Sequence, residues 1–184
     1  MREGYSGRQR IVLGLGLALS GAIIFSSSGL TAGAHLRTVE EPRSGRMEWM
    51  RFPPAQLEWW IFEEVNRERA RRDLPPLVWE ALLAEIARQH SRDMAMRGFF
   101  GHVTPEGVDV ETRLRQRGIR RYRWVAENLA LNFDPIYPVG TTIHQWMMSP
   151  GHKRNILGPF RYTGVGVAVA PSGAYYITQL FLDR

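Results

Sequence analysis

The chain has 184 residues, of which 44% are hydrophobic and 23% charged, a composition typical of a soluble globular protein and unlike that of a disordered or fibrous one. This length accommodates one domain with a full hydrophobic core and is short for two. The 24 basic residues outnumber the 18 acidic ones, and the lack of cysteine excludes disulfides, thiolate metal sites and cysteine nucleophiles.

The basic excess consists almost entirely of arginine, because Lys153 is the only lysine. Guanidinium groups are planar and permanently charged, and they suit carboxylates and phosphates. Such a surface favours anionic polymers such as nucleic acid or teichoic acid, and anionic lipid head groups. No recognised nucleic-acid-binding motif accompanies the charge, so we interpret it as a solvated basic face and expect no nucleic-acid partner.

The first 34 residues predict a secretory signal peptide. Three arginines among the first ten residues precede an apolar run from Ile11 to Phe25, and an A-x-A pattern ends at Ala34. These are the three parts of an export signal, and they predict cleavage after Ala34. The alternative is an uncleaved anchor, because residues 11–34 carry no charge and are long enough to span a bilayer. In both cases the rest of the chain lies outside the cytoplasmic membrane, and the anchor is the only membrane contact that we expect.

Residues 35–54 mix charge, glycine and proline without a lasting period, so we interpret them as a linker before a domain over residues 55–184. A first helix is predicted over residues 55–73, ended by two prolines. A second is predicted from near Leu77 to Gly98. The first places Leu57, Trp60, Ile61, Glu64, Val65 and Arg69 at helical spacing, with charges on its other face. The second carries on one stripe Leu82, Leu83, Ile86, Ala87, His90 and Met94, with Glu85, Arg88, Gln89 and Arg92 facing away.

The rest of the chain predicts shorter helices and then strands. Residues 108–118 favour a short helix with a glycine stop, and residues 134–150 contain another that ends at Pro150. The runs "YTGVGVAVA" and "AYYITQLFL" predict a hairpin around Pro171-Ser172-Gly173, and "RWVAENLAL" predicts a further strand. The order of elements predicts a mixed α/β domain, with helices packed on a mostly antiparallel sheet.

Two of the five histidines, His102 and His152, each follow the end of a predicted helix, which suits a site assembled from loops. Glu127 interrupts an apolar run, where a carboxylate is costly to bury unless it is paired or reaches a cleft. Asn128 beside it can bond to the backbone and fix the local geometry. We therefore weigh a shared site of His102, Glu127 and His152 against scattered surface histidines.

The remaining candidates are weaker. His35 falls in the linker, His90 on a buried stripe, and His144 either packs or faces solvent. Ser149 near His152 resembles a nucleophile beside a base, but neighbours in sequence rarely form such a pair, because its roles depend on three-dimensional geometry.

Five segments in order carry a family resemblance over Leu57 to Phe181. They are "VNRERARRDLPPLVWEALLAEIARQHSRDMAMRGFFGH", "AENLA", "WMMSPGHKRNIL", "GVGVAVA" and "YYITQLF". Together they resemble the bacterial, SCP-like branch of the CAP superfamily, the group of cysteine-rich secretory proteins, antigen 5 and pathogenesis-related proteins. The resemblance implies an α+β fold, a three-layer α-β-α sandwich with a central, mostly antiparallel sheet. It also implies an open cleft lined by two histidines and two acidic residues.

Carried over to this chain, the resemblance assigns His102, Glu127 and His152 to the cleft, with Asn128 beside them. The second acidic residue would fall near Ser149, where this chain has none. Two imidazoles and one carboxylate can still form an open site for a divalent metal such as zinc. Glu106 or Asp109 are candidates to restore the missing charge, and the alternative is no cofactor.

The resemblance implies an exported protein of the cell envelope or extracellular space that binds a lipid, glycan or peptide ligand in this cleft. The alternative is a metal-assisted or general-base hydrolase, in which Glu127 activates a water polarised by a metal on His102 and His152. A third interpretation places the three residues in a buried polar network with a structural role. The sequence leaves the ligand, enzymatic activity and oligomeric state open.

Overall fold

The computed structural model describes residues 11–14, by their backbone, and residues 52–184. The predicted signal peptide and linker otherwise lie outside the described residues, so the cleavage after Ala34 stays a prediction. Within the described part of the chain, no helix combines the length and apolarity needed to cross a membrane.

The described residues form five helices and five strands. In chain order these are β1 (Ile11–Gly14), α1 (Pro54–Ala70), β2 (Val78–Trp79), α2 (Ala81–Arg97), α3 (Val110–Gln116), β3 (Trp124–Asn132), α4 (Pro138–Met148), α5 (Pro150–Ile156), β4 (Tyr162–Val169) and β5 (Tyr175–Asp183).

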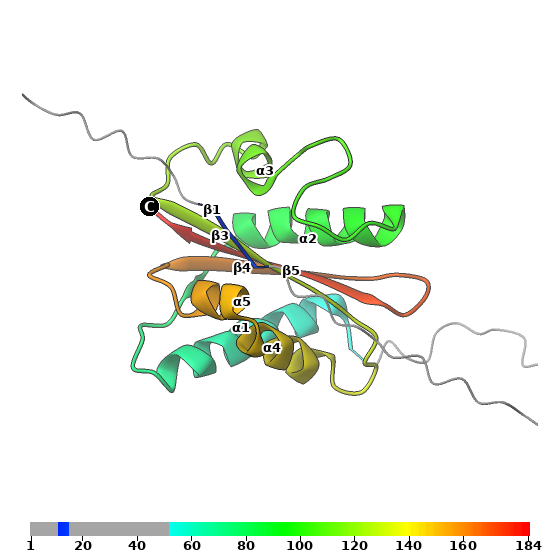
Figure 1. Cartoon of the computed structure of the whole chain (residues 1–184), viewed down its shortest axis with the longest axis horizontal. Coiled ribbons are helices and arrows are strands. Elements are labelled where there is room, and N and C mark those ends of the chain that lie inside the picture. The colour runs from blue at the N-terminus through cyan, green and yellow to red at the C-terminus, as the bar shows by residue number, and fades with distance from the viewer. Residues whose placement is uncertain (1–10, 15–51) are drawn as a thin grey trace, which may run out of the picture.

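The strands form one sheet in the order β1-β3-β5-β4-β2. The central pairs, β3–β5 and β4–β5, are antiparallel, and the outer pairs, β1–β3 and β2–β4, are parallel. Helices α2 and α3 cover one face of the sheet, and α1, α4 and α5 cover the other (Figure 1). The α+β class and the three-layer sandwich are therefore confirmed.

Apolar side chains fill both interfaces between the sheet and its helices. Trp146 and Phe181 are the largest buried side chains on the α1, α4 and α5 side. Leu83, Leu114 and Leu180 lie in the core on the α2 and α3 side. Each fully buried side chain of this size stabilises the fold by roughly 1.5–3 kcal/mol relative to exposure, so both faces fix the sheet in place.

The second helix starts later than predicted. Val78 and Trp79 pair with the start of β4 as β2, and α2 begins at Ala81. The predicted end is confirmed, because Gly98 closes α2 in the left-handed conformation with φ 67°.

Two glycines of the "GVGVAVA" segment let α2 lie directly against β4. A Cβ atom at Gly164 would come within 2.1 Å of the Ala84 backbone nitrogen, and one at Gly166 within 2.1 Å of the Arg88 backbone nitrogen. No larger side chain fits there without moving the helix, so the segment sets the distance between helix and sheet.

The prediction that a helix ends at Pro150 is confirmed to within two residues, but the prediction that His152 then lies on a loop is wrong. Helix α4 ends at Met148, the backbone of Ser149 is extended, and Pro150 is the first residue of α5. Proline is favoured at a first helical position because its missing N–H would have no partner there. His152 therefore lies in the first turn of a helix that packs beside α4.

Candidate functional site

Glu127 is at the centre of a buried polar network on the α2 and α3 side of the sheet. Its side chain is 0% exposed and accepts a hydrogen bond from His102 Nδ1 at 2.8 Å. Arg113 Nη2 donates to both carboxylate oxygens, at 2.9 and 3.1 Å, and to the His102 carbonyl at 3.0 Å. One guanidinium on α3 therefore joins the carboxylate on β3 to the loop that carries His102.

The carboxyl group of Glu127 is held in its ionised form. Burial alone would raise the pKa of Glu127, but the nearby Arg113 guanidinium and the hydrogen bond from His102 outweigh it and hold this pKa below its usual range. An ionised carboxylate only accepts hydrogen bonds, so the His102 Nδ1–H is the donor.

His90 supports the same loop from α2. Its Nε2 lies 2.9 Å from the carbonyl oxygen of Gly101, the residue before His102. Burial lowers the pKa of His90 to about 4, so the ring is neutral at physiological pH and donates through Nε2–H. The prediction that His90 lies on a buried stripe is confirmed.

His152 is fixed to β3 from the other face of the sheet. Asn128 Nδ2 donates to the His152 carbonyl at 3.1 Å, and Asn155 Nδ2 donates to Asn128 Oδ1 at 2.8 Å. Neighbouring residues of a strand point to opposite faces, so Glu127 and Asn128 hold the two histidine segments from opposite sides of β3. The predicted bonding of Asn128 to the backbone is therefore present.

A hollow of about 570 Å³ lies between the C-terminal part of β3 and helices α4 and α5, and we call it the His152 pocket. Of the predicted site residues, His152 and Ser149 line it, whereas His102, Glu127 and Asn128 do not. Its lining comprises Phe100, Leu129, Ala130, Leu131, Asn132, Phe133, Asp134, Thr141, Gln145, Trp146, Met148, Ser149 and His152.

The buried network does not fit the metal site that the resemblance implies. Among the described residues, no three His, Asp or Glu side chains are arranged to hold a metal ion. Both Glu127 oxygens face Arg113, a cation that already balances the carboxylate. Glu106 pairs with Arg97, and Asp109 accepts from the Thr112 N–H as the cap of α3. We therefore derive no chemistry from a metal.

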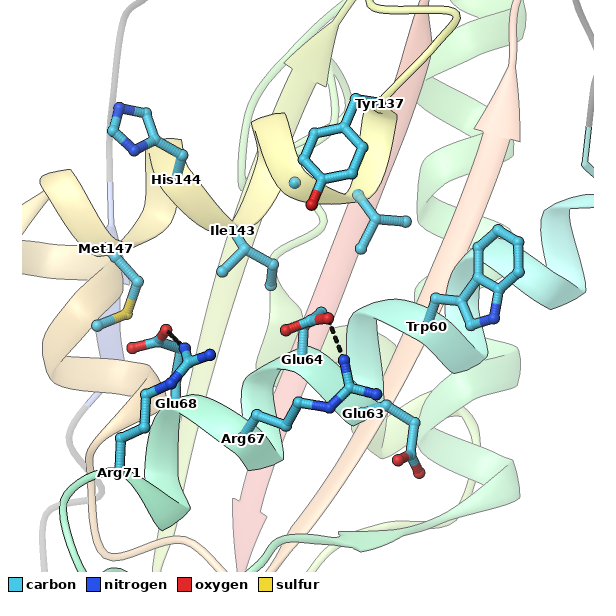
Figure 2. Close-up of a pocket in the computed structure, with 12 residues that line it drawn as sticks. Trp60, Glu63, Glu64, Arg67, Glu68, Arg71, Tyr137, Ile143, His144 and Met147 are labelled. Carbon is cyan, nitrogen blue, oxygen red and sulfur yellow. Dashed lines mark hydrogen bonds and ion pairs between the residues drawn. The ribbon is translucent and has the colours of Figure 1, made fainter.

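A second groove, of about 600 Å³, lies between α1 and α4. Figure 2 shows Tyr137, Ile143 and Met147 on one side of this groove, pointing toward the α1 side chains, while His144 points away from them. Two exposed arginines there are paired with glutamates of α1, Arg67 with Glu64 and Arg71, just beyond the helix, with Glu68. His144 is exposed at its rim, and none of the predicted site residues lines it.

Sequence reasoning missed Arg113, the residue that neutralises Glu127. The predicted short helix carries Val110, Arg113 and Leu114 at i, i+3 and i+4, and all three are buried. Because Arg113 falls at the same helical spacing as two apolar residues, the sequence already indicated that this arginine faces the core.

Comparisons with known proteins agree with the fold. A sequence model of the Cysteine-rich secretory protein family, CAP, matches residues 62–181. The chain is 32% identical over 124 residues to the uncharacterized protein YkwD of Bacillus subtilis (strain 168), covering 67% of this chain and 46% of YkwD. It is 31% identical to the uncharacterized membrane protein YlbC of the same strain, covering 67% of this chain and 34% of YlbC. The chain thus spans less than half the length of these relatives.

Solved structures show the same arrangement. An extracellular protein containing a SCP domain from Bacillus anthracis str. Ames is 29% identical with a TM-score of 0.62, covering 71% of this chain and 41% of that one. An outer surface protein from Borrelia burgdorferi is 16% identical with a TM-score of 0.63, covering 72% of this chain and 96% of that one. The second likeness shows the fold alone.

Proposed function

The chain belongs to the cysteine-rich secretory protein (CAP) family, in its bacterial SCP-like branch, and from this premise we propose that it is an extracellular or envelope protein whose ligand occupies the His152 pocket. The extracellular SCP-domain relative from Bacillus anthracis and the signal pattern in the first 34 residues support the location.

The lining of the His152 pocket is the observation that carries the proposal. Ligand pockets are concave and mostly apolar, with a few polar groups that orient the ligand. Here Phe100, Phe133 and Met148 supply exposed apolar surface, while Gln145 and Ser149 supply partly exposed polar groups. This lining favours a lipid or an apolar peptide over an unmodified glycan.

The network around Glu127 supports a structural role for that residue. A general base must reach the water that it activates. Glu127 is completely buried, and its two oxygens are occupied by Arg113 and His102. The geometry therefore gives the hydrolase alternative no support. It favours the interpretation in which the network holds the His102 loop against β3.

A charge placed at the rim of the pocket tests the proposed site. Met148→Glu introduces a carboxylate at the pocket, and Met96→Glu is the matched control, because these methionines are 71% and 73% exposed and Met96 lies outside the lining. A fluorescent palmitate analogue, an apolar heptapeptide and a chitotetraose would be titrated by fluorescence anisotropy.

We expect the palmitate analogue or the heptapeptide to bind, with about tenfold weaker binding to the Met148→Glu protein, because a carboxylate loses solvation beside an apolar ligand. The Met96→Glu protein should bind within about twofold of the unchanged protein. Equal binding by both variants, or binding of chitotetraose alone, contradicts the proposal.

A further inference from the structure

Exposed arginines gather at the end of the sheet opposite the His152 pocket. The strand register places the start of β3 beside the end of β5, and the start of β4 on the other side of β5 (Figure 1). Arg123, Arg161 and Arg184 directly adjoin these three strand ends, and all three are exposed. The fold therefore brings together arginines that are up to 61 positions apart in the sequence.

The segment between α3 and β3 adds further arginines to this end. Residues 113–123, from the end of α3 to the start of β3, read "RLRQRGIRRYR", with six arginines and no acidic residue. Of these arginines only Arg113 is buried. Arg117 reaches Glu85 in the first turns of α2, so the segment also lies over that end of α2. We call the exposed set the basic end. It comprises Arg115, Arg117, Arg120, Arg121, Arg123, Arg161 and Arg184.

Much of the charge at the basic end is not neutralised by the protein. Arg117 pairs with Glu85 and Arg184 with Glu80. The other arginines of the set, Arg115, Arg120, Arg121, Arg123 and Arg161, make no ion pair with any residue in the described part of the chain. The exposed arginines at the C-terminal end of α1 differ, because Arg67, Arg71 and Arg72 all pair with glutamates of α1. Arg92, Lys153 and Arg154 are also exposed and unpaired, so the basic end holds the larger share, but not all, of the unpaired positive charge of the described residues.

We propose that the basic end binds a linear, base-free phosphodiester polymer, the chemistry of a polyol-phosphate cell-wall polymer. One guanidinium group can donate two parallel hydrogen bonds to the oxygens of one phosphate. Several arginines side by side can therefore bind a polymer whose phosphates repeat along the chain. The choice of a wall polymer rests on the extracellular location proposed above.

A lipid surface fits this end less well. Proteins that lie on membranes combine cations with apolar side chains that enter the bilayer. The large apolar side chains that are more than 60% exposed lie elsewhere. They are Met96, Phe133, Ile136, Tyr137 and Met148.

A nucleic acid also fits less well. Single strands are held by aromatic rings on which bases stack. At the basic end, the ring of Tyr162 already has the guanidinium groups of Arg161 and Arg184 at 5.3 and 5.1 Å from its centroid. Tyr122 and Trp124 are partly buried. The surface therefore offers charge rather than a stacking platform.

The test compares two variants that lose the same charge. Arg120→Gln/Arg121→Gln/Arg123→Gln removes three arginines of the basic end. Arg97→Gln/Lys153→Gln/Arg154→Gln removes three exposed cations elsewhere on the surface. Binding of the purified protein to fluorescent poly(glycerol phosphate) would be measured from about 50 to about 200 mM NaCl, together with the melting temperature of each variant.

The basic-end variant should bind at least about tenfold more weakly at low salt, and its slope of log K against log salt should fall by roughly two to three, because each phosphate contact releases condensed counterions. The control should bind within about twofold of the unchanged protein. Equal losses in both variants overturn the proposal. So does tighter binding, at equal phosphate, to phosphatidylglycerol vesicles or to single-stranded DNA. Met148→Glu should leave polymer binding unchanged, so the two proposals fail separately.

Discussion

Glu58 and Glu127 are both buried carboxylates paired with an arginine, but they lie on opposite sides of the central strand β5, Glu58 against β4 and Glu127 on β3. Glu58, on α1, is 1% exposed, receives the Arg88 guanidinium at 2.7 to 3.0 Å and accepts from the Val167 N–H at 3.1 Å. Its bonds join α1 to α2 and to the part of β4 that does not pair with β2. Glu127 instead joins β3 to α3 and the His102 loop.

The comparison indicates that burial beside an arginine does not by itself mark a catalytic carboxylate. Both glutamates connect elements that are separated in the sequence, but only Glu127 belongs to a motif of the family. Their partners differ in solvent access, since the Arg88 side chain is 36% exposed and that of Arg113 is 9% exposed. Water can therefore reach the Glu58–Arg88 pair, but it hardly reaches the Glu127–Arg113 pair.

Removing each arginine tests this difference and should give the largest effect. Arg113→Ala leaves the Glu127 charge buried and unpaired, and we expect a loss of about 3–5 kcal/mol in the free energy of unfolding. Arg88→Ala should cost about 1–3 kcal/mol, because water replaces part of the lost bond and the Val167 N–H remains. Urea unfolding of both variants measures the difference. A larger loss for Arg88→Ala contradicts the comparison.

Acid titration sharpens the description of Glu127. Its pKa is lower in the folded protein than in the unfolded chain, so its contribution to stability is complete above the unfolded value of about 4.3 and is lost as the pH falls towards the folded value. Glu127→Gln cannot titrate. Melting temperatures between about pH 7 and pH 3 should therefore fall less steeply for Glu127→Gln than for the unchanged protein. Parallel curves would show that Glu127 does not contribute.

A smaller effect is expected on the other face of β3. Asn155→Ala removes the bonds to Asn128 Oδ1 and to the Glu127 carbonyl, at 2.8 and 3.3 Å. We expect a loss of about 1–2 kcal/mol in unfolding free energy, because the buried Asn128 oxygen is left without this donor. Thermal unfolding measures it. A loss as large as that of Arg113→Ala would show that the amides, rather than the ion pair, hold the site together.

Zinc should have the smallest effect. Since Arg113 balances Glu127, zinc ions or a chelator should change the melting temperature by less than about 1 °C, as a ligand stabilises a protein only by binding its folded state. Elemental analysis of protein purified without a histidine tag is the independent check. A stoichiometric metal that raises the melting temperature would show that the network rearranges to admit it.

The sequence predicted most of the fold because periodicity reports which face of each element is buried. The stripe of α1 was correct at Leu57, Ile61, Val65 and Arg69, and the hairpin was correct as well. Glu58 is buried but was not part of the predicted stripe, and its partner Arg88 is 30 positions away. Arg88 itself was expected to face away from the core. A helical period separates two faces but does not identify a long-range partner that neutralises a buried charge.

The candidate site was predicted less completely. The motifs put His102 and Glu127 together, and the structure joins them directly. They did not reveal that His152 lines a separate hollow with Ser149, because strand alternation sends Glu127 and Asn128 to opposite faces. Pro150 was ambiguous for a local reason, since proline both stops one helix and favours the first position of the next.

The most direct test of the account asks whether ligand binding depends on the carboxylate of Glu127. The double substitution Glu127→Gln/Arg113→Met removes both charges, keeps an acceptor for His102 Nδ1, and leaves every residue of the His152 pocket unchanged. Replacing both members of a buried ion pair is often close to neutral for stability. The account predicts a folded protein that binds the palmitate analogue or the heptapeptide within about twofold of the unchanged chain. A folded protein that binds more than about tenfold more weakly would contradict it.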